Sequence, residues 1–146
     1  MTTDNANPML EARNIFIRYG RDPDVVKGVS IAIRRTEITC LVGPNGAGKS
    51  SVLASMAGVV IPSGGEVFLA GEPLHRLKRR DRARRIGFLP QVIRPSIPYT
   101  VYELVALGRY ALGTGFVFET QADRDAVTRA MEETRCDHLA TRLFSE

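Results

Sequence analysis

Residues 40–53 read CLVGPNGAGKSSVL, and the expected fold follows from this stretch. It fits the pattern G-x-x-x-x-G-K-[ST], with Gly43, Gly48, Lys49 and Ser50 in the fixed positions. Glycines let the backbone turn so that successive N–H groups point at phosphate oxygens, and a helix that starts there adds its positive end. The lysine adds a full charge for the β- and γ-phosphates, and the serine hydroxyl is a hard ligand for Mg²⁺. The stretch therefore predicts a site for nucleotide phosphates.

The flanks of this stretch have the pattern that such a loop needs. Residues 37–43, EITCLVG, form a continuous apolar run, which predicts a strand buried on both faces. Residues 49–59 have the spacing of a helix. Upstream, residues 13–18 and 29–34 alternate apolar and polar side chains, which predicts two half-buried strands. We predict two further short strands, at residues 66–71 and 86–91.

The last third of the chain has the character of helices. Apolar residues in 101–108 recur at the spacing of one helix face. Thr120 followed by Asp123 is typical of a capped helix start, and we expect that helix to run to about Arg135. Strands therefore come first and helices after, which indicates an α/β chain with a boundary near residue 95.

Composition and charge fit an ordinary soluble protein. The 146 residues are 44% hydrophobic and 25% charged, and the first ten carry no basic or apolar leader. Cys40 and Cys136 are not in metal-type spacing, so we expect reduced thiols in an intracellular protein. Residues 76–85, RLKRRDRARR, suit either a nucleic-acid or anionic-membrane surface, or a solvated arginine-rich helix face. No aromatic residue is interleaved there, which favours the solvated face.

Several stretches together resemble the ATP-binding cassette (ABC) family. PNGAGKS is typical of that family's Walker A loop. IRYG at 17–20 resembles its A-loop, which implies that Tyr19 stacks on adenine. RRIGFLPQ resembles the segment that ends in the Q-loop, which implies that Gln91 touches Mg²⁺ or the attacking water and that this segment senses the membrane partner. PSGGEVFLAGEPL at 62–74 is similar to the family's turn and strand after the first helix. YTVYELVALGRY at 99–110 is similar to the ATPase subunits of importers for iron–siderophore complexes, haem or vitamin B12.

The resemblance implies an α/β P-loop NTPase core of the ABC ATPase type, with N-terminal antiparallel strands and then the start of a helical subdomain. It divides the chain into a nucleotide-binding core over 1–95 and the beginning of the helical subdomain over 96–146. It implies ATP and Mg²⁺ as cofactors, with Lys49 and Gln91 as catalytic residues and Ser50 and Gln91 as metal ligands. The residues that it assigns to the nucleotide are Tyr19, Gly43, Pro44, Asn45, Gly46, Ala47, Gly48, Lys49, Ser50 and Ser51.

The implied function is that of the ATP-binding subunit of an ABC transporter, which couples ATP binding and hydrolysis to import. The implied partners are membrane permease subunits and a second ATPase subunit, with no nucleic acid. The implied location is cytoplasmic, peripheral on the inner face of the cell membrane through the permease. Thr36 departs from the family pattern, because a glycine usually stands before the Glu of the loop strand.

The family motifs that complete catalysis are not among the 146 residues. The signature loop, the Walker B aspartate, the catalytic glutamate, the D-loop and the switch histidine should follow ATRLFSE at 140–146. We therefore expect these residues alone to bind Mg-ATP, to hydrolyse it negligibly and to be marginally stable, because residues 38–42 would lack a neighbouring strand. Three alternatives stay open: a non-catalytic nucleotide-binding or permease-docking module, a small P-loop kinase, and an ABC protein that acts on nucleic acid or ribosomes.

Overall fold

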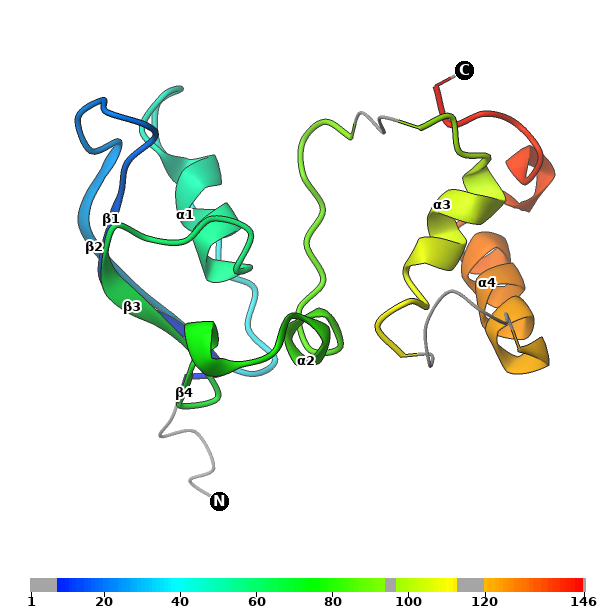
Figure 1. Ribbon diagram of the computed structural model, residues 1–146, viewed down its shortest axis with the longest axis horizontal. Coiled ribbons are helices and arrows are strands. Elements are labelled where there is room, and N and C mark those ends of the chain that lie inside the picture. The colour runs from blue at the N-terminus through cyan, green and yellow to red at the C-terminus, as the bar shows by residue number, and fades with distance from the viewer. Residues whose placement is uncertain (1–7, 94–96, 113–119, 146) are drawn as a thin grey trace. The chain divides into compact units, whose positions relative to one another are not determined.

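The computed structural model describes residues 8–93, 97–112 and 120–145. The chain divides into two compact units, one ending at Phe88 and one beginning at Leu89 (Figure 1). The first unit contains the sheet and the glycine loop, by which we mean residues 43–48. The second unit contains the last helices of the chain.

The sheet of the first unit is antiparallel throughout, in the order β2-β1-β3-β4. Leu10 at the start of β1 pairs with Ile33 of β2 on one side and with Leu69 of β3 on the other. Irregularities in both ladders fall between Ala12 and Ile17, where β1 bends. The expected N-terminal antiparallel strands are thus confirmed. The strands are β1 (Leu10–Ile17), β2 (Val26–Ile33), β3 (Gly64–Leu69) and β4 (Glu72–Pro73).

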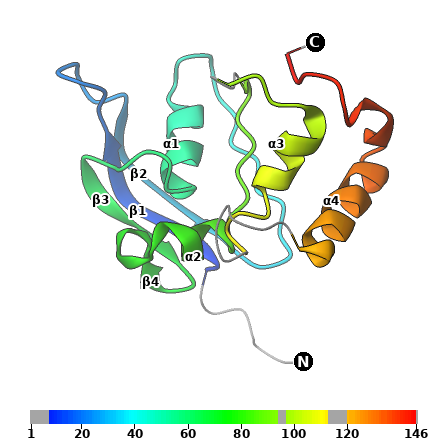
Figure 2. The ribbon, with the colours of Figure 1, turned by 45° about the vertical axis from the view of Figure 1, so that its right-hand side comes forward.

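Helix α1 (Lys49–Met56) packs against one face of this sheet (Figure 2). Ile15 and Ile17 of β1 are fully buried, and because they are two residues apart they point to the same face. Val52 and Met56 of α1, four residues apart, complete the contact from the helix side. The hydrophobic core therefore lies between the sheet and α1, the helix that follows the glycine loop.

The basic run lies largely on a short helix, α2 (Arg79–Ala83), which follows the 3₁₀ turn η1 (Leu74–Arg76). Helix α2 has no buried residue. At the end of the run, Arg85 pairs with Glu72 of β4 at 3.3 Å. The basic run thus lies on an exposed helix beside a strand, and its solvated role stays a prediction.

The predicted strand over 37–43, here called the apolar segment, is wrong. Residues 37–44 form neither helix nor strand, and Ile38 and Val42 are 96% and 89% exposed. Cys40, between them, is also exposed. A strand needs a hydrogen-bonded neighbour, and no strand within the described ranges pairs with this segment. Its apolar sequence is therefore exposed rather than buried.

Two further details concern segments that connect the helices and strands. Thr36, just before the apolar segment, has φ +60°, a left-handed conformation that glycine adopts more easily than a β-branched residue. The predicted short strand at 86–91 is also wrong, since these residues form no ladder and Leu89 is 83% exposed. As with the apolar segment, the apolar residues there have no strand to pair with in the described part of the chain.

The second unit is built on two capped helices, α3 (Val101–Leu107) and α4 (Gln121–Glu133), which pack on each other. The predicted cap of α4 is confirmed: Thr120 Oγ1 accepts from the Asp123 N–H, and the Asp123 carboxylate accepts from the Thr120 N–H. Hydrogen bonds from Thr120 and then Arg109 hold the pKa of Asp123 below its usual value.

A 3₁₀ turn, η2 (Asp137–Leu139), follows α4. Across the described ranges, no helix is both long and apolar enough to cross a membrane.

Candidate functional site

The glycine loop owes its shape to left-handed turns at Gly46 and Gly48, with φ of +81° and +86°. Gly48 is buried and is the N-cap of α1. A methyl group there would lie 2.9 Å from Val26 Cγ2 and 3.1 Å from the carbonyl oxygen of Val25. Gly48 is therefore required twice, for its backbone conformation and for its contact with the start of β2.

The first turn of α1 is open to an anion. No side chain caps the helix and no acidic residue lies in its first turn. The Val52 N–H makes the first intrahelical bond, to the Gly48 carbonyl at 2.9 Å. The N–H groups before it point out of the helix end, where the helix dipole also favours negative charge.

The side chain of Lys49 folds back over the glycine loop. Its ammonium donates to the carbonyl oxygens of Gly43 at 2.8 Å and of Pro44 at 2.6 Å. An ammonium has three protons, so two of these donors are held by the loop and one is left over. The charge is thus fixed beside the N-terminus of α1, where the sequence predicted the phosphates.

A second contact joins the loop after β1 to the same helix turn. The Tyr19 hydroxyl donates to Ser51 Oγ at 3.1 Å. Tyr19 is 45% exposed, and Ser51 is half-buried. The structure therefore joins Tyr19 to the helix turn that carries Lys49, although no sequence pattern predicts a bond between Tyr19 and Ser51.

The remaining predicted site residues are less constrained. Ser50, Asn45 and Ala47 are exposed on the loop and the first turn of α1. Gln91 is exposed and belongs to the other compact unit, so its part in the site stays a prediction. In the residues that the structure describes, no group of three or more His, Cys, Asp or Glu could hold a metal ion.

Sequence reasoning missed the residues that support the site from the β1–β2 connection and the start of β2. Val25 and Val26 form the surface against which Gly48 packs. Arg18 and Asp24 close the loop that carries Tyr19, through bonds of 2.9 and 3.2 Å between guanidinium and carboxylate. The hydrogen bond from Arg18 lowers the pKa of Asp24. The opposite charges six residues apart were the available signal for this ion pair.

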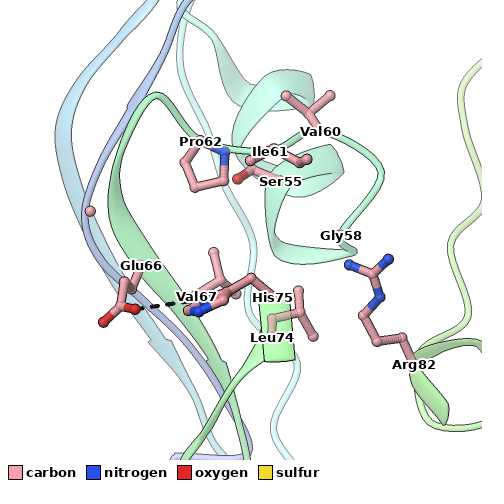
Figure 3. A pocket seen from close by; sticks show the side chains of 11 residues that line it. Ser55, Gly58, Val60, Ile61, Pro62, Glu66, Val67, Leu74, His75 and Arg82 are labelled. Carbon is pink, nitrogen blue, oxygen red and sulfur yellow. Dashed lines mark ion pairs between the residues drawn. The ribbon is translucent and has the colours of Figure 1, made fainter. Parts of the chain in front are cut away.

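A hollow of about 250 Å³ lies at the far end of α1 from the glycine loop (Figure 3). Its walls include Ile61, Val67 and Leu74, and His75 lies 3.7 Å from Glu66 at its edge. The hydroxyl of Ser55 is buried there without a hydrogen-bond partner in the described structure. Because Ser55 follows Lys49 by more than one helical turn, this hollow is separate from the candidate phosphate site.

Comparison with known proteins agrees with this geometry. The family model described as "ABC transporter" matches residues 26–146. The chain is 35% identical to the hemin import ATP-binding protein HmuV of Pseudomonas entomophila, over 93% of this chain and 51% of that protein. It is 36% identical to the ferric enterobactin transport ATP-binding protein FepC of Escherichia coli, over 90% of this chain and 48% of that protein. The chain thus spans about half the length of the curated relatives it matches.

Solved structures show the same fold at lower identity. One is a dimeric ATP-binding cassette in a post-hydrolysis state, bound to ADP and phosphate, with a TM-score of 0.77 at 22% identity; the match covers 94% of this chain and 62% of that one. Another is a nucleotide-free ATP-binding cassette from an ABC transporter, with a TM-score of 0.71 at 23% identity, over 92% and 56% of the two chains. The family model, the fold and the glycine loop agree, and the chain belongs to the ABC transporter family.

Proposed function

We propose that this chain binds Mg-ATP at the glycine loop and the first turn of α1. The phosphates would lie against the N–H groups of residues 45–51, with the Lys49 ammonium on the β- and γ-phosphates. Ser50 would contribute its exposed hydroxyl to Mg²⁺. The ring of Tyr19 would stack on adenine, an interaction worth about 1–3 kcal/mol.

The observation that supports this proposal most directly is the position of the Lys49 ammonium. It is held by two carbonyl groups of the loop, next to an uncapped helix N-terminus. Positive charge and free N–H groups thus converge on one point, and phosphate is the ligand that suits both. Binding would exchange loop carbonyls for phosphate oxygens as the partners of the ammonium.

We propose further that the whole protein is the ATP-binding subunit of an importer for an iron–siderophore complex, haem or cobalamin. The printed names of the relatives, hemin import and ferric enterobactin transport, support this substrate class. In this proposal Gln91 contacts Mg²⁺ or water, and the following residues dock on a permease. A second ATPase subunit completes the assembly at the inner face of the membrane.

For residues 1–146 by themselves, we propose binding with negligible hydrolysis. Phosphoryl transfer needs an oriented water and stabilised charge in addition to the phosphate cradle. The glycine loop, Lys49 and Ser50 supply the cradle, and the sequence contains neither the family's Walker B nor its signature motif. The alternative of a non-catalytic nucleotide-binding or permease-docking module makes the same prediction for this stretch.

The test is calorimetric titration of Mg-ATP into the chain and its Lys49→Ala variant. A hydrogen bond to a charged group contributes about 1.5–3 kcal/mol, so we expect Lys49→Ala to weaken binding by about tenfold to a hundredfold. Lys78→Ala is the matched control, because Lys78 is exposed and lies before α2. Equal binding by the wild-type chain and Lys49→Ala would contradict the proposal. Steady phosphate release that depends on Lys49 would contradict negligible hydrolysis alone.

A further inference from the structure

The bond between Tyr19 and Ser51 connects two parts of the candidate site that an aromatic stack alone would leave independent. Tyr19 lies two residues beyond the end of β1, and Ser51 lies in the first turn of α1. The phenol donates to Ser51 Oγ at 3.1 Å, while the residue stays 45% exposed. The tip of the side chain is thus anchored, and much of the rest is accessible.

The backbone that carries Tyr19 is itself fixed on the sheet. The Val25 N–H donates to the Ile17 carbonyl at 2.8 Å, which closes the loop between β1 and β2. The bidentate pair of Arg18 and Asp24 holds the same two ends together. Tyr19 follows Arg18 directly, so its hydroxyl reaches α1 from a braced position.

Because the Tyr19 hydroxyl is the donor in this bond, the proton of Ser51 Oγ is not used in it. A serine hydroxyl can donate once and accept twice. Here Ser51 Oγ accepts from Tyr19, and no acceptor for its own proton is found in the described part of the chain. That proton lies on the same helix turn as Lys49. It therefore remains available to an incoming acceptor beside the ammonium.

We infer that Tyr19 is a positioning residue that acts through Ser51: its hydroxyl keeps donating to Ser51 Oγ when nucleotide binds, which leaves the Ser51 proton for a phosphate oxygen. This inference rests on the proposed nucleotide site. It assigns the phenol a role in phosphate binding that is separate from any stacking of the ring on the base. Tyr19 would then contribute to binding twice, through its ring at the base and through its hydroxyl, by way of Ser51, at the phosphates.

Two substitutions separate the two roles of Tyr19. Tyr19→Phe keeps the ring and removes the donor, whereas Tyr19→Leu removes both. The ligands are Mg-ATP and magnesium tripolyphosphate, which has the phosphates without a base. We expect Tyr19→Phe to lower the affinity for both ligands by about threefold to tenfold, the effect of one neutral hydrogen bond. Compared with Tyr19→Phe, Tyr19→Leu should lower the affinity for Mg-ATP further and leave the affinity for tripolyphosphate the same.

A double-mutant cycle with Ser51→Ala tests the route of the effect. If Tyr19 acts through Ser51, Tyr19→Phe has no additional effect in the Ser51→Ala background. Tyr99→Phe, in the other compact unit, is the matched control for loss of a phenol hydroxyl. Thermal unfolding of each variant checks that the fold is unchanged.

The outcomes distinguish the inference from the function on which it rests. If the wild-type chain binds Mg-ATP in a Lys49-dependent way but Tyr19→Phe leaves tripolyphosphate affinity unchanged, the inference alone is overturned. Independent, multiplying effects of Tyr19→Phe and Ser51→Ala overturn it as well. If the wild-type chain binds neither ligand, the proposed function fails and the inference fails with it.

Discussion

The glycine loop and the apolar segment adjoin each other in the chain, yet only the loop has defined packing. Gly48 is buried against β2, and Lys49 is hydrogen-bonded to two loop carbonyls. Ile38 and Val42, a few residues earlier, are almost fully exposed. The described contacts of the loop come from neighbours that are present: Val25 and Val26 at the start of β2, and Lys49 in α1. The apolar segment needs a strand to pair with, and the described ranges contain none for it.

Among variants of the loop and the apolar segment, Gly48→Ala should lower the stability of the first unit the most. A left-handed conformation costs an L-residue about 1–2 kcal/mol, and the methyl group would also press on Val26 and on the Val25 carbonyl. We expect the free energy of unfolding of the first unit to fall by about 2–3 kcal/mol. Urea denaturation, followed by the NMR signals of that unit, measures it.

Gly46→Ala is the matched control for that experiment. Gly46 has nearly the same φ, but nothing lies within 4 Å of a methyl group there. Gly46→Ala should therefore lower the free energy of unfolding by about 1 kcal/mol. The difference between the losses in Gly48→Ala and Gly46→Ala measures the contact of Gly48 with β2. Equal losses would show that the loop is shaped by backbone conformation alone.

A smaller effect of opposite sign is expected at Thr36. A β-branched residue at φ +60° is strained, and glycine relieves that strain but increases the entropy of the unfolded chain. We expect Thr36→Gly to raise the free energy of unfolding by roughly 0.5–1 kcal/mol. Thr36→Ala, which keeps a Cβ but loses the hydroxyl bond to the Arg35 carbonyl, controls for that bond. A loss of stability in Thr36→Gly would mean that the strain is absent in solution.

The smallest effect should come from Ile38→Ser. Because Ile38 is 96% exposed, we expect a change within about 0.5 kcal/mol in the same urea experiment. Ile15→Ala is the contrasting variant, since Ile15 is fully buried and its truncation should cost about 2–5 kcal/mol. A large loss of unfolding free energy in Ile38→Ser would show that the apolar segment is buried in solution. The contrast between that segment and the glycine loop would then not hold.

Features whose causes lie within a few residues could be predicted from the sequence. Thr120 and Asp123 form the reciprocal cap that their spacing indicated. The glycine loop turns at Gly48 and leads into a helix, as its pattern required. Strands β1 and β2 follow the alternation of apolar residues, because their partners are each other and the nearby β3.

Features that depend on distant partners could not be predicted. The apolar residues of 37–43 and 86–91 indicate segments suited to burial, and their local pattern predicted strands. The missing neighbour of residues 38–42 was expected from the family resemblance, but its consequence, a segment left outside the sheet, was not predicted. The contact of Gly48 with Val25 and Val26 and the bond from Tyr19 to Ser51 join residues more than twenty positions apart. Pairs like these follow from the fold and have no local signature.

The exposed apolar segment contains its own chemical reporter. Cys40 lies in the middle of that segment and is exposed, whereas Cys136 is partly covered and 3.2 Å from Thr134 Oγ1. A bulky thiol reagent should therefore modify Cys40 first, without any engineered residue. The labelling rate of that thiol would then report directly when a strand, a subunit or a membrane component covers the segment.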